Sequence, residues 1–177
     1  MNTYNCKIRL VADYLQARFS DKSKNELEVK SGKKAKVKDT DSWEALMYKD
    51  EKGIYIPAMQ IKGALINGGK SIKKKPHGNF KNDVRAYMFV SPEKIYIGKQ
   101  KPDFINESYP KRQMDGTRVK LLHPAFKSGL EVNFKLNCTN DEIDEKTIKV
   151  IVEKAGLEYG IGAWRPEHGR FEVVEIK

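Results

Sequence analysis

The chain has 177 residues, of which 39% are hydrophobic and 33% charged, and its formal net charge is +10. This length suits a single domain that buries its own core. The sequence shows no signal-peptide pattern and no apolar run of about 20 residues. We therefore expect a cytoplasmic protein that is neither secreted nor inserted in a membrane.

The charge is concentrated in the first four fifths of the chain. Residues 141–177 hold six Lys/Arg and nine Asp/Glu, whereas residues 1–140 hold 28 and 15. Such a concentration of positive charge favours a polyanionic partner, because each neutralised phosphate releases counterions. A lysine-rich surface that only keeps the protein in solution is the alternative.

The first part of the chain predicts a strand, a basic insertion and a helix. Alternating apolar residues from Tyr4 to Ala12 indicate a half-buried strand. Residues 20–41 lose this alternation and carry seven lysines between positions 22 and 38, within a basic insertion expected at 20–53. A helix is expected to begin at Pro57, because proline is favoured at the first helical position, and to end at Pro76.

The rest of the chain alternates predicted strands with one more helix. The pattern predicts strands at 84–90 and 94–98, followed by a loop at 99–116 within a second insertion at 99–129. A strand at 130–138 and a helix from Asp144 to Gly156 come next. A Gly-rich loop at 160–170 and a last strand at 170–176 complete the order. This order predicts an α+β fold, a ferredoxin-like (RRM-like) βαββαβ domain spanning residues 1–177. The basic insertion separates its first strand from its first helix.

Several single residues carry structural expectations. Cys6 and Cys138 fall in strand patterns without metal-ligand spacing, so we expect buried free thiols. Tyr87 and Phe89 share one face of the predicted strand at 84–90, and we expect both in the core; exposed strand aromatics that stack on bases are the alternative. His123 precedes Pro124 and is assigned a structural role.

Two glycine-bearing segments are candidates for binding phosphate. At the helix start, free N–H groups would accompany Gln60, Lys62 and Gly63, a combination that suits an anion. In the Gly-rich loop, Trp164 could stack on a base and Arg165 could pair with phosphate. The alternatives are an ordinary strand-to-helix junction and a turn whose tryptophan packs in the core.

Together the two segments resemble a known family. Residues 50–65, with Tyr55-Ile56-Pro57, Lys62-Gly63 and Leu65, are similar to the stretch D-x-x-T-G-x-P-Y-I-P-G-S-S-L-K-G-x-L-R. That stretch marks backbone subunits of CRISPR effector complexes of the RAMP superfamily, whose other hallmark is a Gly-rich loop before the last strand. Ala58-Met59-Gln60 replaces Gly-Ser-Ser, so the chain resembles a stand-alone relative of phage or mobile-element origin.

The resemblance implies a protein that binds single-stranded nucleic acid, RNA rather than DNA, and assembles along it. Its partners would be single-stranded RNA or DNA and a homo-oligomer or a CRISPR- or phage-protein complex in a bacterial, archaeal or phage-infected cell. No cofactor or metal is expected. The predicted contacts are Gln60, Lys62, Gly63, Lys73, Lys74, Lys75, Gly160, Gly162, Trp164, Arg165, His168 and Arg170.

Two other functions stay open. One is an assembly or interaction protein that has lost nucleic-acid binding. The other is a metal-independent endoribonuclease, for which the catalytic candidates are His168 in the Gly-rich loop and Asp39 and Asp41 in the basic insertion.

Overall fold

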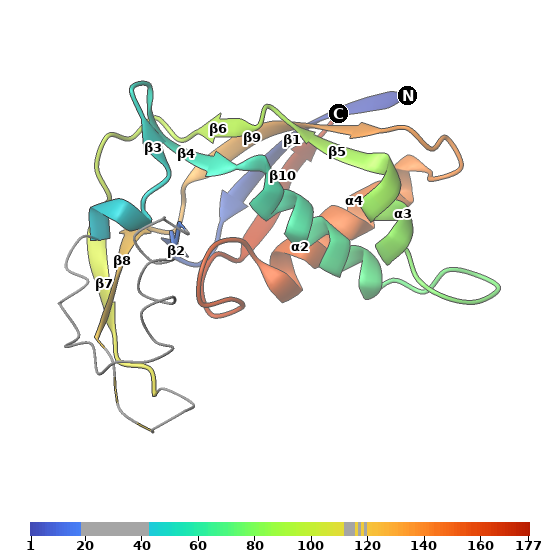
Figure 1. The fold of residues 1–177 in the computed structure, drawn as a ribbon. Coiled ribbons are helices and arrows are strands. Elements are labelled where there is room, and N and C mark those ends of the chain that lie inside the picture. Colours follow the sequence, from blue (N-terminus) through green and yellow to red (C-terminus); the bar gives the residue numbers. More distant parts are fainter. Residues whose placement is uncertain (19–42, 112–115, 117, 119) are drawn as a thin grey trace, which may run out of the picture.

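The computed structural model describes residues 1–18, 43–111, 116, 118 and 120–177, and it shows a mixed α+β fold (Figure 1). The predicted α+β class is therefore confirmed. Most of the predicted basic insertion lies outside the described residues, including the lysines at 22–38, Asp39 and Asp41. None of the helices within the described ranges is long and apolar enough to cross a membrane.

The main sheet has four antiparallel strands in the order β10-β1-β9-β5. Their bounds are Asn2–Leu10 for β1, Met88–Ser91 for β5, Glu131–Cys138 for β9 and Phe171–Ile176 for β10. The predicted alternation is confirmed in β1, where Cys6 and Ile8 are buried, and in β9, where Phe134 lies opposite Cys6. Both cysteines are buried free thiols, as expected.

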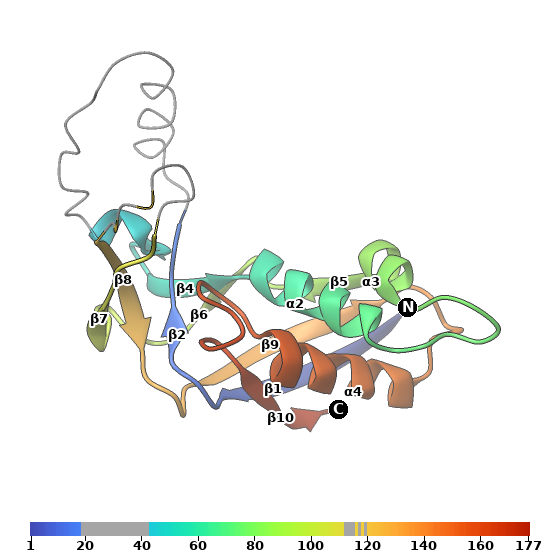
Figure 2. The same ribbon diagram turned by 90° about the horizontal axis from the view of Figure 1, so that it is seen from below.

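Two helices, α2 (Ala58–Lys70) and α4 (Glu145–Lys154), contribute apolar side chains to the core beside this sheet (Figures 1 and 2). Gly68 allows them to pack closely, because a Cβ there would lie 2.5 Å from the Ile151 carbonyl oxygen. The predicted cap of α4 is confirmed, since Asp144 Oδ1 accepts a 2.7 Å hydrogen bond from the Thr147 N–H.

Both predicted helix ends are wrong. α2 stops at Lys70 rather than Pro76, and Ser71 N–H closes the end by donating to the Gly68 carbonyl. Gly156 does not stop α4, because the chain continues through a π-helical turn, Ala155–Tyr159. Gly156 is instead buried against Phe171, where any Cβ would overlap the Phe171 carbonyl oxygen and ring.

The predicted strand at 84–90 is wrong over its first half. A short helix, α3 (Lys81–Tyr87), precedes β5, and Val84 packs against Gly69 of α2. This contact is remote in sequence, so the local apolar pattern does not contain it. Because the strand begins only at Met88, Tyr87 and Phe89 do not enter the core and are 41% and 50% exposed.

The chain forms two further sheets of three strands each among the described residues. The predicted strand at 94–98 is present as β6 (Lys94–Tyr96), but it pairs with β4 (Gly53–Pro57) beside β3 (Lys49–Asp50), not with β5.

The second small sheet has the order β2-β8-β7, with bounds Tyr14–Leu15 for β2, Phe104–Ser108 for β7 and Leu121–Phe126 for β8. The predicted loop at 99–116 is therefore wrong at β7. Proline inside a central strand is unusual, so Pro124 in β8 argued against a strand there, and the pairing of β7 with β8 was not predicted.

Candidate nucleic-acid interface

The Gly-rich loop is fixed against β2 and the residue before it by main-chain hydrogen bonds. Ala163 N–H donates to the Leu15 carbonyl at 2.9 Å, and Gly169 N–H donates to the Asp13 carbonyl at 2.8 Å. Within the loop, Ile161 N–H donates to the Gly169 carbonyl at 2.9 Å. The backbone of the loop is therefore held in one conformation by hydrogen bonds to the rest of the fold.

Its predicted glycines are required by this close packing. Gly162, at φ +83°, lies against Tyr14, and a Cβ there would be 2.6 Å from the Tyr14 ring and would overlap the Leu15 carbonyl oxygen. Gly169, at φ +74°, leaves no room for a Cβ beside Ile161, and a Cβ at Gly160 would lie 2.8 Å from Gly169. All three glycines set the loop's shape.

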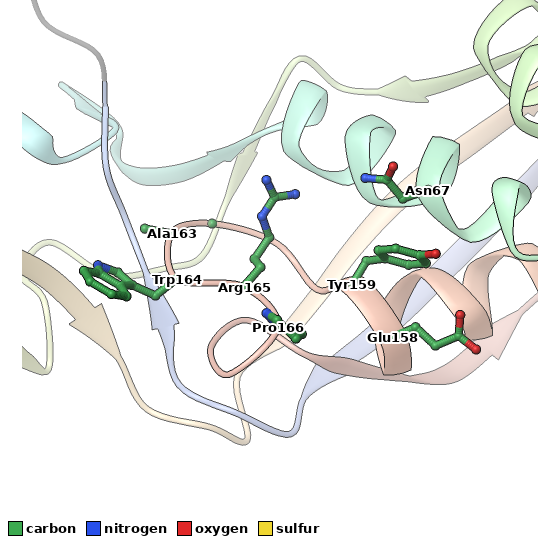
Figure 3. A pocket seen from close by; sticks show the side chains of 8 residues that line it. Asn67, Glu158, Tyr159, Ala163, Trp164, Arg165 and Pro166 are labelled. Atoms are coloured by element: carbon green, nitrogen blue, oxygen red, sulfur yellow. The ribbon is translucent and has the colours of Figure 1, made fainter. Parts of the chain in front are cut away.

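The loop tip presents two side chains to solvent. Trp164 is 42% exposed and has a left-handed backbone conformation, with φ 57°. Arg165 is exposed, and its side chain makes no hydrogen bond or ion pair with any described residue. Figure 3 shows Arg165 extending from the loop toward α2 and Trp164 pointing the other way.

Two histidines lie behind Trp164. The His123 ring on β8 meets the Trp164 ring edge-on, with centroids 6.2 Å apart. His123 is buried, as its structural assignment implies, and its Nδ1 has no partner among the described residues. Burial lowers the pKa of His123, and the nearby His168 lowers it further. His168 is half-buried, and its main-chain N–H donates a 3.1 Å hydrogen bond to the Trp164 carbonyl.

The start of α2 joins this loop through Tyr14. The Tyr14 hydroxyl donates a 2.8 Å hydrogen bond to Gln60 Oε1, while the Tyr14 ring lies under Gly162. Gly63 follows Gln60 on α2, and a Cβ built there would meet nothing within 4 Å. The structure therefore brings the two predicted segments together on one side of the molecule (Figures 1 and 2).

Lys62 faces away from this junction, toward α3. Its Nζ donates to the carbonyl oxygens of Val84 at 2.5 Å, Arg85 at 3.1 Å and Met88, and lies 5.1 Å from the centre of the Phe89 ring. Partial burial lowers the pKa of Lys62. A phosphate contact by Lys62 would require the ammonium group to leave these carbonyls.

The lysines at 73–75 lie beyond the far end of α2. Their loop extends away from the Gly-rich loop in both views (Figures 1 and 2). Lys74 forms a 2.7 Å ion pair with Asp83, whereas Lys73 and Lys75 make no ion pair with a described residue. Arg170 is exposed beside β10, and its carbonyl accepts from Val11 and Ala12.

An open pocket of about 470 Å³ lies between α2 and the Gly-rich loop (Figure 3). Five of its residues are not among the predicted contacts, namely Asn67, Glu158, Tyr159, Ala163 and Pro166. The π-helical turn that places Glu158 and Tyr159 has no local sequence signature. The lining of the pocket comprises Asn67, Glu158, Tyr159, Gly162, Ala163, Trp164, Arg165 and Pro166. Among the described residues, no group of three or more His, Cys, Asp or Glu side chains could hold a metal ion.

Comparison with known proteins gives a likeness of fold. No family model matches the sequence, and no curated protein matches it. A chain in the cryo-EM structure of the Type III-B Cmr-beta bound to cognate target RNA superposes with a TM-score of 0.56 at 16% identity. The match covers 99% of this chain but only 59% of that one, so the present chain spans less than two thirds of its neighbour. The chain thus shares its fold with part of one chain in the structure of an RNA-bound Type III-B Cmr-beta.

Proposed function

We propose that this chain is a RAMP-like protein of the ferredoxin-like class that binds single-stranded RNA between α2 and the Gly-rich loop. The sheet order β10-β1-β9-β5, with α2 following β1 and α4 following β9, supports the split βαβ arrangement. The fold shared with a chain of an RNA-bound Cmr complex supports RNA and a CRISPR-type complex as partners.

The observation that carries this proposal is the tip of the Gly-rich loop. A loop fixed by main-chain hydrogen bonds carries an exposed tryptophan and, at the next position, an arginine whose side chain pairs with no described residue, and the two side chains point in different directions. Aromatic rings stack on unpaired bases of any sequence, and each such contact contributes about 1–3 kcal/mol. Arginine pairs with phosphate through a planar fork of donors. Trp164 and Arg165 together therefore suit one base and one phosphate of a single strand.

The bare surface at Gly63 gives the strand a second contact. Glycine in a helix interior costs about 1 kcal/mol relative to alanine. At Gly63 neither packing nor backbone conformation requires it, because a Cβ would meet no atom within 4 Å. A glycine that the fold does not need, beside the Gly-rich loop, leaves room for the close approach of a ligand backbone.

The other predicted basic residues take outer or structural roles in this proposal. Lys73, Lys75 and Arg170 would add salt-sensitive contacts along the path of the strand. Lys62 and Lys74 serve the fold through the α3 carbonyls and Asp83, respectively.

Arg165→Ala tests the proposal. We expect it to weaken binding of a fluorescein-labelled 12-nucleotide RNA by about tenfold or more, because a charge-assisted hydrogen bond is lost. It should also make the salt dependence shallower by about 0.7 in the log–log slope, the value for one phosphate on a single strand. Fluorescence anisotropy at several salt concentrations measures both quantities.

The matched control is Lys149→Ala, which removes one positive charge from an exposed position on α4. It should leave affinity within about twofold, because it lies outside the site. Equal effects of the two variants, or undetectable RNA binding at low salt by the unaltered protein, would contradict the proposal.

A further inference from the structure

A buried histidine supports the exposed tryptophan of the Gly-rich loop. His123, on β8, is 6% exposed, and its ring lies at 88° to the Trp164 ring with the centroids 6.2 Å apart. Edge-to-face aromatic pairs prefer separations of about 4.5–7 Å. Among the described residues, His123 is the only aromatic ring that Trp164 contacts. His123 therefore orients the side chain to which base stacking is assigned.

The small sheet β2-β8-β7 gives His123 a fixed position. β8 is its central strand, paired with β2 on one side and β7 on the other. The same sheet holds the backbone of the loop, because the Leu15 carbonyl of β2 accepts from Ala163 N–H. The loop backbone is thus held by β2, and its tryptophan ring by β8.

A histidine at this position is costlier for the fold than an apolar ring would be. Nδ1 of His123 is buried and has no hydrogen-bond partner among the described residues. A buried polar atom without a partner lowers stability, whereas phenylalanine would offer an aromatic edge without this cost. What distinguishes histidine from phenylalanine here is its ability to take up a proton near neutral pH.

The protonated ring would be disfavoured in this site. Neutral imidazole can leave Nδ1 without a hydrogen, whereas imidazolium donates from both ring nitrogens. The Nδ1–H of His123 would then be buried without an acceptor among the described residues. Burial lowers the pKa of His123, and the neighbouring His168 lowers it further, in agreement with this geometry.

Among the described residues, no carboxylate offsets a charge on His123. The elements around β8 are β2, β7, the 3₁₀ turn Trp43–Leu46 and the Gly-rich loop, and their titratable or charged residues are Tyr14, Glu44, Glu107, Arg165, Glu167 and His168. Of these, His168 alone shifts the pKa of His123. Glu107 lies opposite Leu122 and therefore on the other face of the sheet, and Glu44 and Glu167 are exposed.

We propose that neutral His123 positions Trp164 for stacking on a base, and that protonation of His123 releases the ring and weakens RNA binding. This positioning role rests on the proposed function and adds a dependence on pH to it. Attraction between imidazolium and RNA phosphate would act in the opposite direction. That attraction is a screened contact near the surface, and it contributes less than the burial of an unpaired donor costs. The net effect of acidification is therefore weaker binding.

The experiment measures affinity for a rhodamine-labelled, all-uridine 12-nucleotide RNA by fluorescence anisotropy from pH 7.5 to pH 5 at constant ionic strength. Uracil does not titrate in this range, so the strand adds nothing to the profile. The unaltered protein should bind about threefold to tenfold more weakly at pH 5, the size of one edge-to-face contact. The decline should begin below about pH 6.5, the ordinary pKa of histidine, because the pKa of His123 is lowered.

Two substitutions separate the ring of His123 from its proton. His123→Phe keeps an aromatic edge, so its affinity at pH 7.5 should stay within about twofold and should not decline toward pH 5. His123→Gln lacks both the ring and the titration, so binding should be about threefold weaker at pH 7.5 with the same flat profile. His77→Gln, at an exposed histidine outside the site, is the control and should keep the decline.

Trp164 fluorescence tests the contact without RNA. The chain has two tryptophans, so in a Trp43→Phe background Trp164 is the one that remains. Imidazolium quenches indole emission, so emission should fall from pH 7.5 to pH 5, and His123→Phe should abolish this fall. Circular dichroism at each pH checks that the fold is retained.

An affinity of the unaltered protein that does not fall toward pH 5, or a fall that persists in His123→Phe, would overturn the role of His123 and leave the proposed RNA binding intact. Trp164 emission that is independent of pH would overturn it as well. Failure to bind RNA at pH 7.5 would overturn the proposed function, and the role of His123 in binding with it.

Discussion

Gly63 and Gly68 lie five residues apart on α2, yet their surroundings differ completely. A Cβ at Gly68 would lie 2.5 Å from a carbonyl oxygen of α4, whereas a Cβ at Gly63 would meet open space. The sequence alone indicates only that both glycines lower the helix propensity of this segment. The sequence could suggest close backbone approach at Gly63, but only the packing shows which glycine serves the fold.

The two glycines therefore predict opposite results for the same substitution. Gly63→Ala should raise the free energy of unfolding by about 0.4–1 kcal/mol, because it removes backbone freedom from the unfolded chain. Gly68→Ala should lower it by about 1–3 kcal/mol through overpacking against α4. Urea unfolding followed by circular dichroism measures both values.

Gly63→Ala should also weaken RNA binding severalfold despite the added stability, because the methyl group occupies the surface where the strand would approach. A stabilised Gly63→Ala protein with unchanged RNA affinity would remove Gly63 from the site.

At the same scale, the exposed tip of the Gly-rich loop was predictable and the partners of Lys62 were not. Trp164 and Arg165 follow closely spaced glycines, and that pattern indicated a shaped loop with functional side chains. Lys62 was predicted as a phosphate contact from its place at the helix start. Its ammonium group instead binds the end of α3, a segment whose sequence pattern predicted a strand.

At the scale of elements, the sequence predicted the strands and helices with regular periodicity correctly and missed the short ones. β1, β9, α4 and β10 carry long, clear patterns, and the structure contains all four. The seven residues of α3 are too few to show a helical period, and they fold as a helix because α2 holds them.

Lys62 provides the test of this tertiary support for α3. Lys62→Met keeps most of the side-chain volume but removes the donor for three carbonyls. It should lower the free energy of unfolding by about 1–2 kcal/mol, the range for a cation at a helix C-terminus in a partly buried site.

Amide hydrogen exchange of residues 81–87 should accelerate in the same variant, while exchange in α4 changes little. An unaltered rate of amide exchange at residues 81–87 would show that the stability of α3 does not depend on Lys62.

The pairing of β7 with β8 predicts a dependence of stability on pH. Asp103 accepts hydrogen bonds from Lys99 Nζ at 2.5 and 2.7 Å and from Lys127 N–H at 2.9 Å. These contacts, led by Lys99, lower the pKa of Asp103. A lowered native pKa means that the stabilisation is present above about pH 4 and is lost as the pH falls through the native value.

Asp103→Asn should therefore reduce stability at pH 7 and flatten its decline toward pH 3. Urea unfolding at pH 7, 5 and 3 measures the profile, with Glu51→Gln at an exposed turn as the control for removing a carboxylate. Parallel profiles for Asp103→Asn and the unaltered protein would assign the acid sensitivity to other groups.

At the scale of the whole molecule, chain order alone placed the start of α2 and the Gly-rich loop near each other. Tyr14 makes the connection, because its ring supports Gly162 and its hydroxyl binds Gln60. The small sheets were not predictable in the same way. Their strands are short and irregular, and their pairing depends on contacts between residues far apart in sequence.

The molecule also offers competing aromatic surfaces for RNA. Phe89 on β5 and Tyr96 on β6 are 50% and 40% exposed, and both lie outside the proposed interface. Exposed aromatic residues on a sheet are a common means of binding single strands. These two residues therefore provide the comparison against which the proposed RNA site is tested.

Ultraviolet crosslinking to a 12-nucleotide RNA, followed by mass spectrometry of the crosslinked peptides, tests this site most directly. We expect crosslinks at Trp164 and Tyr159, and we expect them to be lost in the Arg165→Ala protein at moderate salt. Crosslinks concentrated on Phe89 or Tyr96, with none in residues 158–170, would contradict the proposed site.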